Sequence, residues 1–414
     1  MPRRYWLETL GCPKNEVDSS KLAGSLESDG LTPAGAPEDA DLVVVNTCAF
    51  IEAARAESIE TVLALSDARR PGARVVVTGC LAERYGDELA AALPEVDRVA
   101  GFGVPVRLSS RAVPSFDLLN LRRPPARAPW AYVKVAEGCD RACGFCAIPS
   151  FRGRQRSRTE RDVLDEVASL GAKEIVLVAQ DLASYGRDLG RAGAIVGLVG
   201  RVAELVERTR LLYLYPSELS DRLVDAICDT GVPYFDLSLQ HASRSLLRRM
   251  RRWGDGERFA RRIADIRARE PSAAFRSSFI VGYPGETEDD HDRLLDFLGE
   301  VRLDWAGFFA YSAEEGTHAA GLDGQVPPAL VDERLVELSE LQDGITASRR
   351  ADLVGQTVEV LVDGVGAGRS HREAPEIDGV VRVPGDLHPG DLVELVVTGA
   401  EGPDLEASQL ARAR

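Results

Sequence analysis

Apolar runs alternate with helix-like segments through the first third of the chain. Strand-like runs lie at Tyr5–Leu10, Leu42–Val45 and Val75–Val77, and Glu52–Leu65 is typical of a helix. Because strands that alternate with helices favour parallel pairing, this pattern predicts an α/β domain with a parallel, doubly wound sheet. We expect this domain to occupy residues 1–121.

A second pattern of alternating strands and helices begins after a proline-rich segment. Residues Arg122–Pro129, RRPPARAP, contain three prolines, which is typical of an extended linker. The helical segments of residues 130–350 separate six strand-like runs, which predicts a partial (β/α)6 barrel with active groups at the C-terminal strand ends. The runs are Ala131–Ala136, Glu174–Gln180, Leu211–Pro216, Tyr234–Gln240, Phe275–Gly282 and Trp305–Ser312.

The pattern changes again in residues 351–414. Short valine-rich runs at Thr357–Val362, Gly379–Val383 and Leu392–Val397 are separated by Gly, Pro and Asp turns. This pattern predicts a small C-terminal β-barrel. The module contains twelve acidic residues, five arginines and no lysine, so its net charge is −7.

Composition narrows the class of protein. With 414 residues and 44% apolar content, the chain can bury the cores of two or three domains. It contains neither a run of 18 apolar residues nor a secretory signal, so we expect a cytosolic protein without a membrane partner. A net charge of −16 argues against broad electrostatic binding to nucleic acid and favours a basic partner.

The seven cysteines are too few for a disulfide scaffold, and three of them share a short motif. Cys139, Cys143 and Cys146 have the spacing C-x3-C-x2-C and directly follow the first strand of the predicted barrel. Three thiolates on an iron-sulfur cubane would leave one iron open to a substrate or cofactor. A structural zinc site is the alternative, but it requires four ligands, and no further cysteine or histidine lies nearby in the sequence.

Three other cysteines have a common context. Cys12, Cys48 and Cys80 each follow one of the three N-terminal apolar runs, in LETLGC, VVVNTC and VVVTGC. The ends of parallel strands share one sheet edge, so these residues are candidates for a second three-thiolate site. The alternative is that each is an ordinary buried cysteine. Cys228 lies on a predicted helix without a motif, and we interpret it as a packing residue.

The first motif resembles a known signature. C-x3-C-x-aromatic-C, with Phe145 as the aromatic residue, is similar to the signature of radical S-adenosylmethionine enzymes. The resemblance implies a 4Fe-4S cluster on Cys139, Cys143 and Cys146. It also implies that the open iron binds the amino and carboxylate groups of S-adenosylmethionine, which is then reduced to a 5′-deoxyadenosyl radical.

Over essentially its whole length, the chain resembles the methylthiotransferases of that superfamily. The resemblance implies a flavodoxin-like N-terminal domain, a radical barrel and a C-terminal TRAM domain. It also implies a second 4Fe-4S cluster, here on Cys12, Cys48 and Cys80, which is thought to carry the sulfur of the methylthio group. One S-adenosylmethionine would then be the methyl donor and another the radical source, with an external reductant as a partner.

Several segments resemble the branch that modifies the β-carbon of an aspartate in ribosomal protein S-twelve. The other branch, which modifies adenosine in transfer RNA, is the alternative. The segment Gly368–Gly379 belongs to the C-terminal module, which we expect to meet the substrate. The segments are Gly11–Asn15 (GCPKN), Ala147–Arg158 (AIPSFRGRQRSR), Leu239–Ser243 (LQHAS), Tyr311–Thr317 (YSAEEGT) and Gly368–Gly379 (GRSHREAPEIDG).

The charge of the C-terminal module supports the ribosomal-protein branch. A nucleic-acid module should present a basic face, whereas a net charge of −7 repels a phosphate backbone. Ribosomal proteins are basic and complement an acidic module, so RNA binding is not expected. The alternatives are that the acidity only maintains solubility and that the arginines cluster locally.

A few polar residues near strand ends are candidates for contacts with S-adenosylmethionine. Gln180, Asp181, Gln240 and Arg276 could hydrogen-bond its sugar, amino or carboxylate groups, although polar capping of strand ends is an equal alternative. Gly282, in FIVGYPGE, resembles the superfamily's adenine-contacting strand end, but a simple β-α turn explains it nearly as well. The aromatic Phe145 completes this candidate cofactor set.

Two arginine runs complete the candidate residues. We interpret the run after the cysteine loop as having a structural or cofactor role, because it follows that loop directly. The run in RSLLRRMRR is typical of a solvated helix. The runs are Arg152, Arg154, Arg156 and Arg158, and then Arg244, Arg248, Arg249, Arg251 and Arg252.

The combined pattern predicts an enzyme that uses two clusters to place a methylthio group on an aspartate of ribosomal protein S-twelve. An aliphatic C–H bond offers neither an acidic proton nor a leaving group, so radical chemistry is required. The transfer RNA enzyme is the first alternative. A non-catalytic iron-sulfur protein for binding or electron transfer is the alternative from another class.

Overall fold

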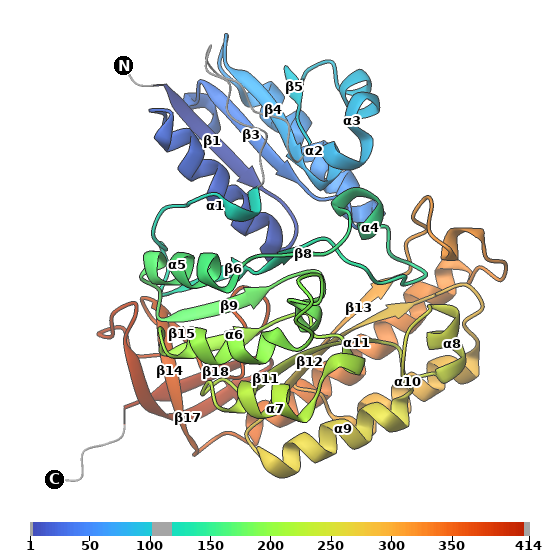
Figure 1. Cartoon of the computed structure of the whole chain (residues 1–414). Coiled ribbons are helices and arrows are strands. Elements are labelled where there is room, and N and C mark those ends of the chain that lie inside the picture. The colour runs from blue at the N-terminus through green and yellow to red at the C-terminus, as the bar shows by residue number, and fades with distance from the viewer. Residues whose placement is uncertain (1–2, 102–117, 410–414) are drawn as a thin grey trace.

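The N-terminal third forms a five-stranded parallel sheet covered by helices (Figure 1). The structure is a computed structural model that describes residues 3–101 and 118–409. The strand order β2-β1-β3-β4-β5 is that of flavodoxin-like sheets, as predicted. The strands are β1 (Arg4–Thr9), β2 (Thr32–Pro33), β3 (Leu42–Thr47), β4 (Arg74–Gly79) and β5 (Arg98–Val99). The helices are α1 (Pro13–Ser28), η1 (Pro37–Asp39), α2 (Glu52–Ala68) and α3 (Cys80–Ala92).

The central strands of this sheet are buried on both faces. In β3, Val43 and Val45 pack in the core on one face, while Leu42 and Val44 pack in the core on the other. A strand covered on both sides reads as a continuous apolar run, which is why these strands were predictable.

Six parallel strands form the predicted partial barrel. Two three-stranded sheets, β6-β9-β10 and β11-β12-β13, meet at a single bridge between Leu214 and Leu237. The strands are β6 (Trp130–Lys134), β9 (Glu174–Val178), β10 (Arg208–Leu211), β11 (Tyr234–Gln240), β12 (Ala274–Val281) and β13 (Trp305–Ala310). The helices around them are α5 (Glu160–Leu170), α6 (Ala194–Ala203), α7 (Asp221–Cys228), α8 (Arg244–Arg249), α9 (Gly256–Arg269), α10 (Glu288–Val301) and α11 (Pro328–Ala351). Shorter elements are η2 (Leu118–Asn120), β7 (Ala136–Glu137), α4 (Ile148–Arg152), β8 (Arg156–Ser157), η3 (Leu182–Ser184), η4 (Pro216–Glu218) and η5 (Ala319–Gly321).

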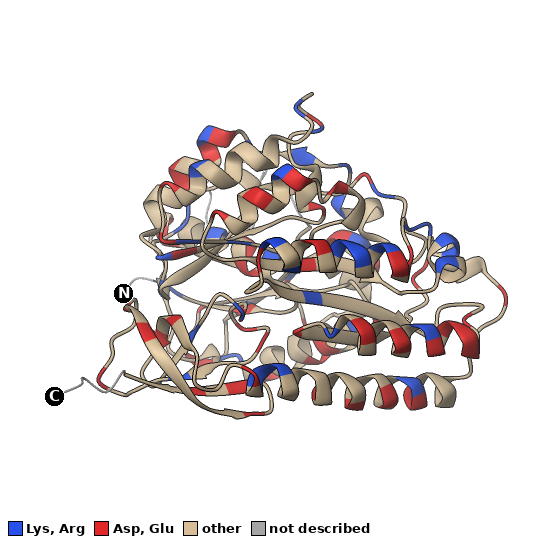
Figure 2. Cartoon of the chain, turned by 90° about the horizontal axis from the view of Figure 1, so that it is seen from below, with Lys and Arg blue, Asp and Glu red and all other residues tan. Residues whose placement is uncertain are grey.

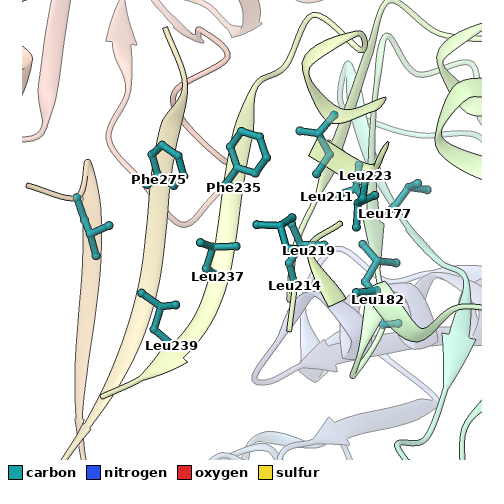
Figure 3. Packing of buried hydrophobic residues seen from close by; sticks show 14 of the residues in the cluster. Leu177, Leu182, Leu211, Leu214, Leu219, Leu223, Phe235, Leu237, Leu239 and Phe275 are labelled. Carbon is teal, nitrogen blue, oxygen red and sulfur yellow. The ribbon is translucent and has the colours of Figure 1, made fainter. Parts of the chain in front are cut away.

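The largest core lies between the strands and these helices. Leucines and phenylalanines of β9 to β12 lie side by side in it (Figure 3). Phe235 and Phe275, on neighbouring strands, stack with a centroid distance of 5.2 Å. The core also accommodates Cys228, which is half-buried at the end of α7 and packs against it, as predicted.

The position predicted for the third barrel strand was wrong by several residues. The run Leu211–Pro216 was expected, but β10 spans Arg208–Leu211. Arg208 and Arg210 are buried because Glu174 and main-chain oxygens of the C-terminal module accept their hydrogen bonds. A strand that contains buried arginines lacks a continuous apolar run, so the apolar pattern of the sequence does not predict it.

The C-terminal module is a closed five-stranded barrel, as predicted. Val360, Val362, Leu395, Val397 and Leu405 fill its interior. Its strands are β14 (Thr357–Gly364), β15 (Ala367–Arg369), β16 (Val381–Arg382), β17 (Leu392–Glu401) and β18 (Asp404–Ser408).

This module covers the N-terminal ends of the large barrel's strands, opposite the end that carries the cysteine loop (Figure 1). Its segment 368–379 belongs to the module that we expect to meet the substrate, but this segment is not an exposed surface. Instead, Ser370 and Glu373 are fully buried, and Tyr132 and Trp305 hydrogen-bond to main-chain oxygens of this segment. The segment therefore seals one end of the barrel.

The proline-rich segment Arg122–Pro129 lacks regular secondary structure but is packed against its surroundings. The Arg123 guanidinium lies 2.8 Å from Glu166 on α5. The domain limits 1–121, 130–350 and 351–414 stay predictions, and residues 102–117 of the first lie outside the described residues. Within the described ranges, no helix has the length and apolar character needed to cross a bilayer.

Candidate functional site

The C-x3-C-x2-C motif lies on the loop between β7 and α4, at the C-terminal end of the first barrel strand. Cys139, Cys143 and Cys146 are all half-buried. Two backbone hydrogen bonds at Gly144 fix the loop, because Gly144 N donates to Met250 O (2.8 Å) and Gly144 O accepts from Ala319 N (2.8 Å). The ends of two distant barrel segments thus hold the three thiols in place.

Two glycines allow this loop to approach its neighbours closely. Gly138 has φ +77°, and a side chain there would overlap the carbonyl oxygens of Gly153 and Arg154. A Cβ at Gly144 would lie 2.9 Å from the Tyr283 hydroxyl oxygen. Only glycine fits at such close backbone contacts.

An arginine of the second run contacts the cysteine loop. Arg252 Nη1 lies 3.3 Å from Cys143 Sγ, and its guanidinium stacks on the ring of Tyr215, 3.9 Å from the centroid. Arg141 stacks on the same ring at 4.0 Å. The prediction that this run is wholly a solvated helix was wrong for Arg252, because its side chain turns inward from the end of α8.

The second set of cysteines occupies one edge of the N-terminal sheet. Cys12 caps α1 after β1, Cys48 follows β3, and Cys80 begins α3 directly after β4. The register pairs Thr47 with Gly79, which brings the next residues, Cys48 and Cys80, to the same level. The switch point of a doubly wound sheet, where ligands bind, lies at this edge.

Local contacts hold these three cysteines together. A Cβ at Gly11 would lie 2.8 Å from Cys48 Sγ, so the chain before Cys12 passes directly over Cys48. Asn15 Nδ2 donates to Leu10 O (2.8 Å) and Thr47 O (3.0 Å), which ties the ends of β1 and β3 together. The structure thus brings together three cysteines that lie far apart in the sequence.

Burial dominates the acid-base properties of the thiols. It raises the pKa of Cys48 and Cys139 to about 11 and that of Cys146 to about 12. For Cys12, burial also raises the pKa, but the charges of Lys14 and Arg152 outweigh it and the pKa is lowered. Most of these thiols would therefore ionise at neutral pH only by binding a metal, which releases the proton.

The donor chemistry of both sets fits iron-sulfur clusters. Each set offers three thiols, with Arg252 beside one set and Arg152 beside the other. Across residues 3–101 and 118–409, no three His, Cys, Asp or Glu side chains converge tightly enough for a single metal ion. A cubane spreads its three ligands over three irons and therefore needs a wider triangle than a single ion.

A buried ionic network links Cys80 to the segments on either side of the Cys139–Cys146 loop. Arg152, at the end of α4, donates from Nη2 to Cys80 Sγ (2.9 Å) and to Asn15 Oδ1 (2.7 Å). Its Nη1 donates to Glu137 Oε1 (3.0 Å) and Asp18 Oδ2 (3.3 Å), and Lys134 pairs with both carboxylates. Two cations and two anions are thus enclosed where the N-terminal domain meets the cysteine loop.

The network continues to one of the predicted cofactor residues. Gln180, just beyond β9, donates from Nε2 to Glu137 Oε1 (2.7 Å). Its own Oε1 is buried and accepts no hydrogen bond within the described part of the chain. A buried acceptor without a partner is costly unless a ligand supplies a donor. This orphaned oxygen suits a ligand donor such as the amino group of S-adenosylmethionine.

The other predicted cofactor residues have different surroundings. Gln240 is half-buried at the end of β11 with φ +72°, a strained value for a residue with a side chain. Phe145 packs against the barrel core from the cysteine loop. Asp181 Oδ2 accepts a hydrogen bond from Arg141 Nε (2.6 Å), while its Oδ1 is buried and has no hydrogen-bond partner among the described residues, so both interpretations of this residue stay predictions.

Two of the candidates have structural explanations in this fold. Arg276 lies near the start of β12, where its guanidinium pairs with Asp236 (3.3 Å) and with Asp378 of the C-terminal module (3.4 Å). A side chain at Gly282 would overlap Val331 of α11, so helix packing accounts for this glycine.

A further contact between domains was not predicted. Glu314, in the segment YSAEEGT, is buried and pairs with Arg84 (2.6 Å) and with Arg55, both from the N-terminal domain. Arg84 also donates to Ala49 O (3.1 Å), next to Cys48. Isolated charged residues such as these give no sequence signal, because their partners are far away in the chain.

Three family descriptions match separate parts of the chain. Residues 4–101 match the uncharacterized protein family UPF0004, residues 133–298 the radical SAM superfamily, and residues 354–409 the TRAM domain.

Curated relatives match nearly the whole chain. Proteins named ribosomal protein uS12 methylthiotransferase RimO are 43% identical in a Nocardioides species, over 97% of this chain and 96% of the relative. The corresponding protein of Moorella thermoacetica is 43% identical over 94% of this chain and 95% of its own. Among solved structures, the radical S-adenosylmethionine methyltransferase TsrM from Kitasatospora setae has a TM-score of 0.49. Its identity is 18%, and the match covers 74% of this chain and 72% of that chain.

Proposed function

The chain belongs to the family of ribosomal protein uS12 methylthiotransferases, and we propose that its two cysteine sets hold the clusters of that reaction. It is a radical S-adenosylmethionine enzyme that adds a methylthio group to uS12. Cys139, Cys143 and Cys146 are the proposed ligands of the radical cluster, and Cys12, Cys48 and Cys80 those of the second. The observation that supports this assignment is the buried contact between Arg152, on α4 directly after the Cys139–Cys146 loop, and Cys80 of the other set (2.9 Å).

The proposed acceptor is the β-carbon of an aspartate. When bound, the cluster on the Cys139 loop supplies the electron that cleaves S-adenosylmethionine, and the cluster on the other set supplies the sulfur. The protein's own residues hold and orient these groups. The proposed acceptor for the amino group of S-adenosylmethionine is Gln180 Oε1, which is supported by its burial without a hydrogen-bond donor among the described residues, and Gln240 and Phe145 are proposed to border the same end of the barrel.

Arg152 and Arg252 position and tune the thiolate ligands. Each places a guanidinium within hydrogen-bond distance of one sulfur, Cys80 or Cys143. Hydrogen bonds to cluster sulfurs are among the factors that set reduction potential. Burial of Arg152 removes competing water, so its bond to Cys80 acts in a medium of low dielectric constant.

The acidic C-terminal barrel is the proposed anchor for the basic substrate. Glu394 on β17 and Glu406 on β18 are exposed, and neither forms an ion pair within the described residues, whereas Glu359 pairs with the buried Arg208 (3.1 Å). Exposed carboxylates without a basic partner attract a cationic protein surface. Because the barrel lies at the far end from the cysteine loop, it would bind the body of uS12 while the target loop extends to the clusters.

Neutralising two exposed carboxylates of the C-terminal barrel should weaken the binding of full-length uS12. For the double variant Glu394→Gln/Glu406→Gln, we expect KM for full-length uS12 to rise about 3- to 10-fold at low ionic strength, with kcat nearly unchanged. Steady-state kinetics at two salt concentrations measure this effect. Glu57→Gln/Glu60→Gln, an exposed pair on α2, removes the same charge from another domain and is the matched control. An equal rise of KM in both variants would contradict the proposed anchor.

Substrate class is tested by offering peptide and RNA separately. The protein is reconstituted anaerobically with iron and sulfide, then given reductant, S-adenosylmethionine and either a uS12 loop peptide or an anticodon stem-loop RNA. Mass spectrometry should detect the methylthio mass increase on the peptide's aspartate and none on the RNA. An adduct on RNA alone would overturn the assignment of substrate. Absence of both an adduct and 5′-deoxyadenosine would overturn the proposed cluster chemistry.

A further inference from the structure

A ridge of unpaired arginines lies beside the radical cluster loop. We define the arginine ridge as the five arginines of α8 and the turn after it; α8 carries no acidic residue, whereas the longer helices mix both signs (Figure 2). Arg244, Arg248, Arg249 and Arg251 are exposed, and Arg252 is half-buried. Among the described residues, no carboxylate forms an ion pair with any member. The members are Arg244, Arg248, Arg249, Arg251 and Arg252.

The next helix provides an internal comparison. α9 also contains five arginines, and each of them has a carboxylate within 4.0 Å. A solvated helix in an acidic protein normally mixes charges of both signs in this way. In a chain with a net charge of −16, five neighbouring cations without acidic partners form a surface that attracts an anionic partner. The arginines of α9 are Arg258, Arg261, Arg262, Arg267 and Arg269.

The ridge is continuous with the cysteine loop. Met250 O, within the ridge, accepts the hydrogen bond of Gly144 N, and Arg252 Nη1 lies 3.3 Å from Cys143 Sγ. Trp253, at the end of the ridge, is 44% exposed. Arginine and tryptophan are enriched at protein interfaces, particularly among the residues that dominate affinity. A partner bound to the ridge would lie near Cys143, because Arg252 contacts that residue.

We propose that the arginine ridge is the docking surface for an acidic one-electron carrier protein of the flavodoxin or ferredoxin class. The inference rests on the proposed function, in which Cys143 is a ligand of the radical cluster. The reduced carrier gives one electron to the oxidised cluster, so the carrier is oxidised and the cluster reduced by one electron, and no proton moves. Carboxylates of the carrier pair with the exposed guanidinium groups of Arg244, Arg248 and Arg251, which places the donor near the cluster and favours rapid electron transfer.

The test measures the binding of the carrier separately from the cleavage of S-adenosylmethionine. The variant Arg244→Gln/Arg248→Gln/Arg251→Gln removes three exposed charges and leaves Arg252 in place. Its matched control, Arg74→Gln/Arg122→Gln/Arg222→Gln, removes three exposed arginines elsewhere that have no ion pair among the described residues. Calorimetric titration of the reconstituted enzyme with a purified acidic flavodoxin measures Kd, and 5′-deoxyadenosine formation is measured with flavodoxin and with dithionite.

We expect the ridge variant to bind flavodoxin about tenfold more weakly at low ionic strength, with the difference shrinking at high salt. Flavodoxin-driven cleavage should slow accordingly, while dithionite-driven cleavage stays at the wild-type rate. Equal Kd values for the wild type, the variant and the control would overturn the docking surface and leave the proposed function intact. Loss of dithionite-driven cleavage in the wild type would instead refute the cluster assignment. Tight binding of an RNA hairpin to the ridge, without flavodoxin binding, would assign the surface to nucleic acid and also overturn the proposal.

Discussion

Replacing Cys143 by alanine is expected to abolish the cleavage of S-adenosylmethionine, whereas Cys48→Ala should preserve cleavage and abolish methylthio transfer. Cys143 lies on the loop at the barrel mouth, while Cys48 ends a strand of the N-terminal sheet. A cubane with only two thiolates loses its defined open iron, so each variant should retain roughly half of the wild-type iron. The different losses of activity follow from the different roles of the two sets.

This contrast is measured on anaerobically reconstituted proteins. Iron is determined chemically, 5′-deoxyadenosine by chromatography, and the methylthio adduct by mass spectrometry. Cys228→Ala is the matched control, because this half-buried thiol lies on α7 within the core packing and should behave as the wild type. Wild-type cleavage in Cys143→Ala would remove Cys143 from the ligand set. Complete iron retention in Cys48→Ala would remove the second cluster.

Arg152→Met is expected to lower the free energy of unfolding by about 3–5 kcal/mol, because it leaves buried carboxylates short of one cation. The side chains of Arg152 and Asp18 are 2% and 1% exposed, so water cannot replace the lost partner. Arg152→Lys should recover only part of the loss, since an ammonium group cannot bridge Glu137, Asn15 and Cys80 as the planar guanidinium does.

The destabilisation caused by Arg152→Met should become smaller as the pH falls. Burial raises the pKa of Glu137, but Arg152 and Lys134 outweigh it and hold the pKa well below its usual value. A lowered pKa stabilises the fold above the unfolded value of 4.5, and this contribution disappears as pH falls through the folded pKa. The difference between wild type and Arg152→Met should therefore be full at neutral pH and shrink below about pH 4.5.

Urea unfolding followed by circular dichroism, at matched iron content, measures these differences. Arg154→Met is the control, because its side chain is 92% exposed and its removal should cost no more than about 0.5 kcal/mol. Equal destabilisation by the two substitutions would show that the buried network contributes nothing specific.

Much of the fold was readable from the sequence because its signals are local. The strands β3 and β4 are continuous valine runs, and Thr159 and Thr287 are the N-caps of α5 and α10, a residue type that favours this position. The position of strand β10 was not predicted correctly. Its buried arginines donate hydrogen bonds to main-chain oxygens more than 150 positions away, which no local pattern reveals.

The sequence predicted the candidate ligands of the site but not the residues that contact them. Cysteine identity and spacing are sequence properties, and thiolate chemistry follows directly from them. The contact of Arg252 with Cys143 spans 109 positions and that of Arg152 with Cys80 spans 72, so neither leaves a local pattern. The same holds for Glu314 and its arginine partners across the domain interface.

By itself, the sequence determined the candidate thiol ligands, the order of three domain types and the acidity of the C-terminal module, because each depends on residue identity and short-range periodicity. The tertiary structure alone decided that Arg152 contacts Cys80, that segment 368–379 is buried in the barrel, and that the arginine ridge borders Cys143. These features depend on which surfaces pack together. That packing is set by the shape and charge of elements far apart in the chain, which no local pattern encodes.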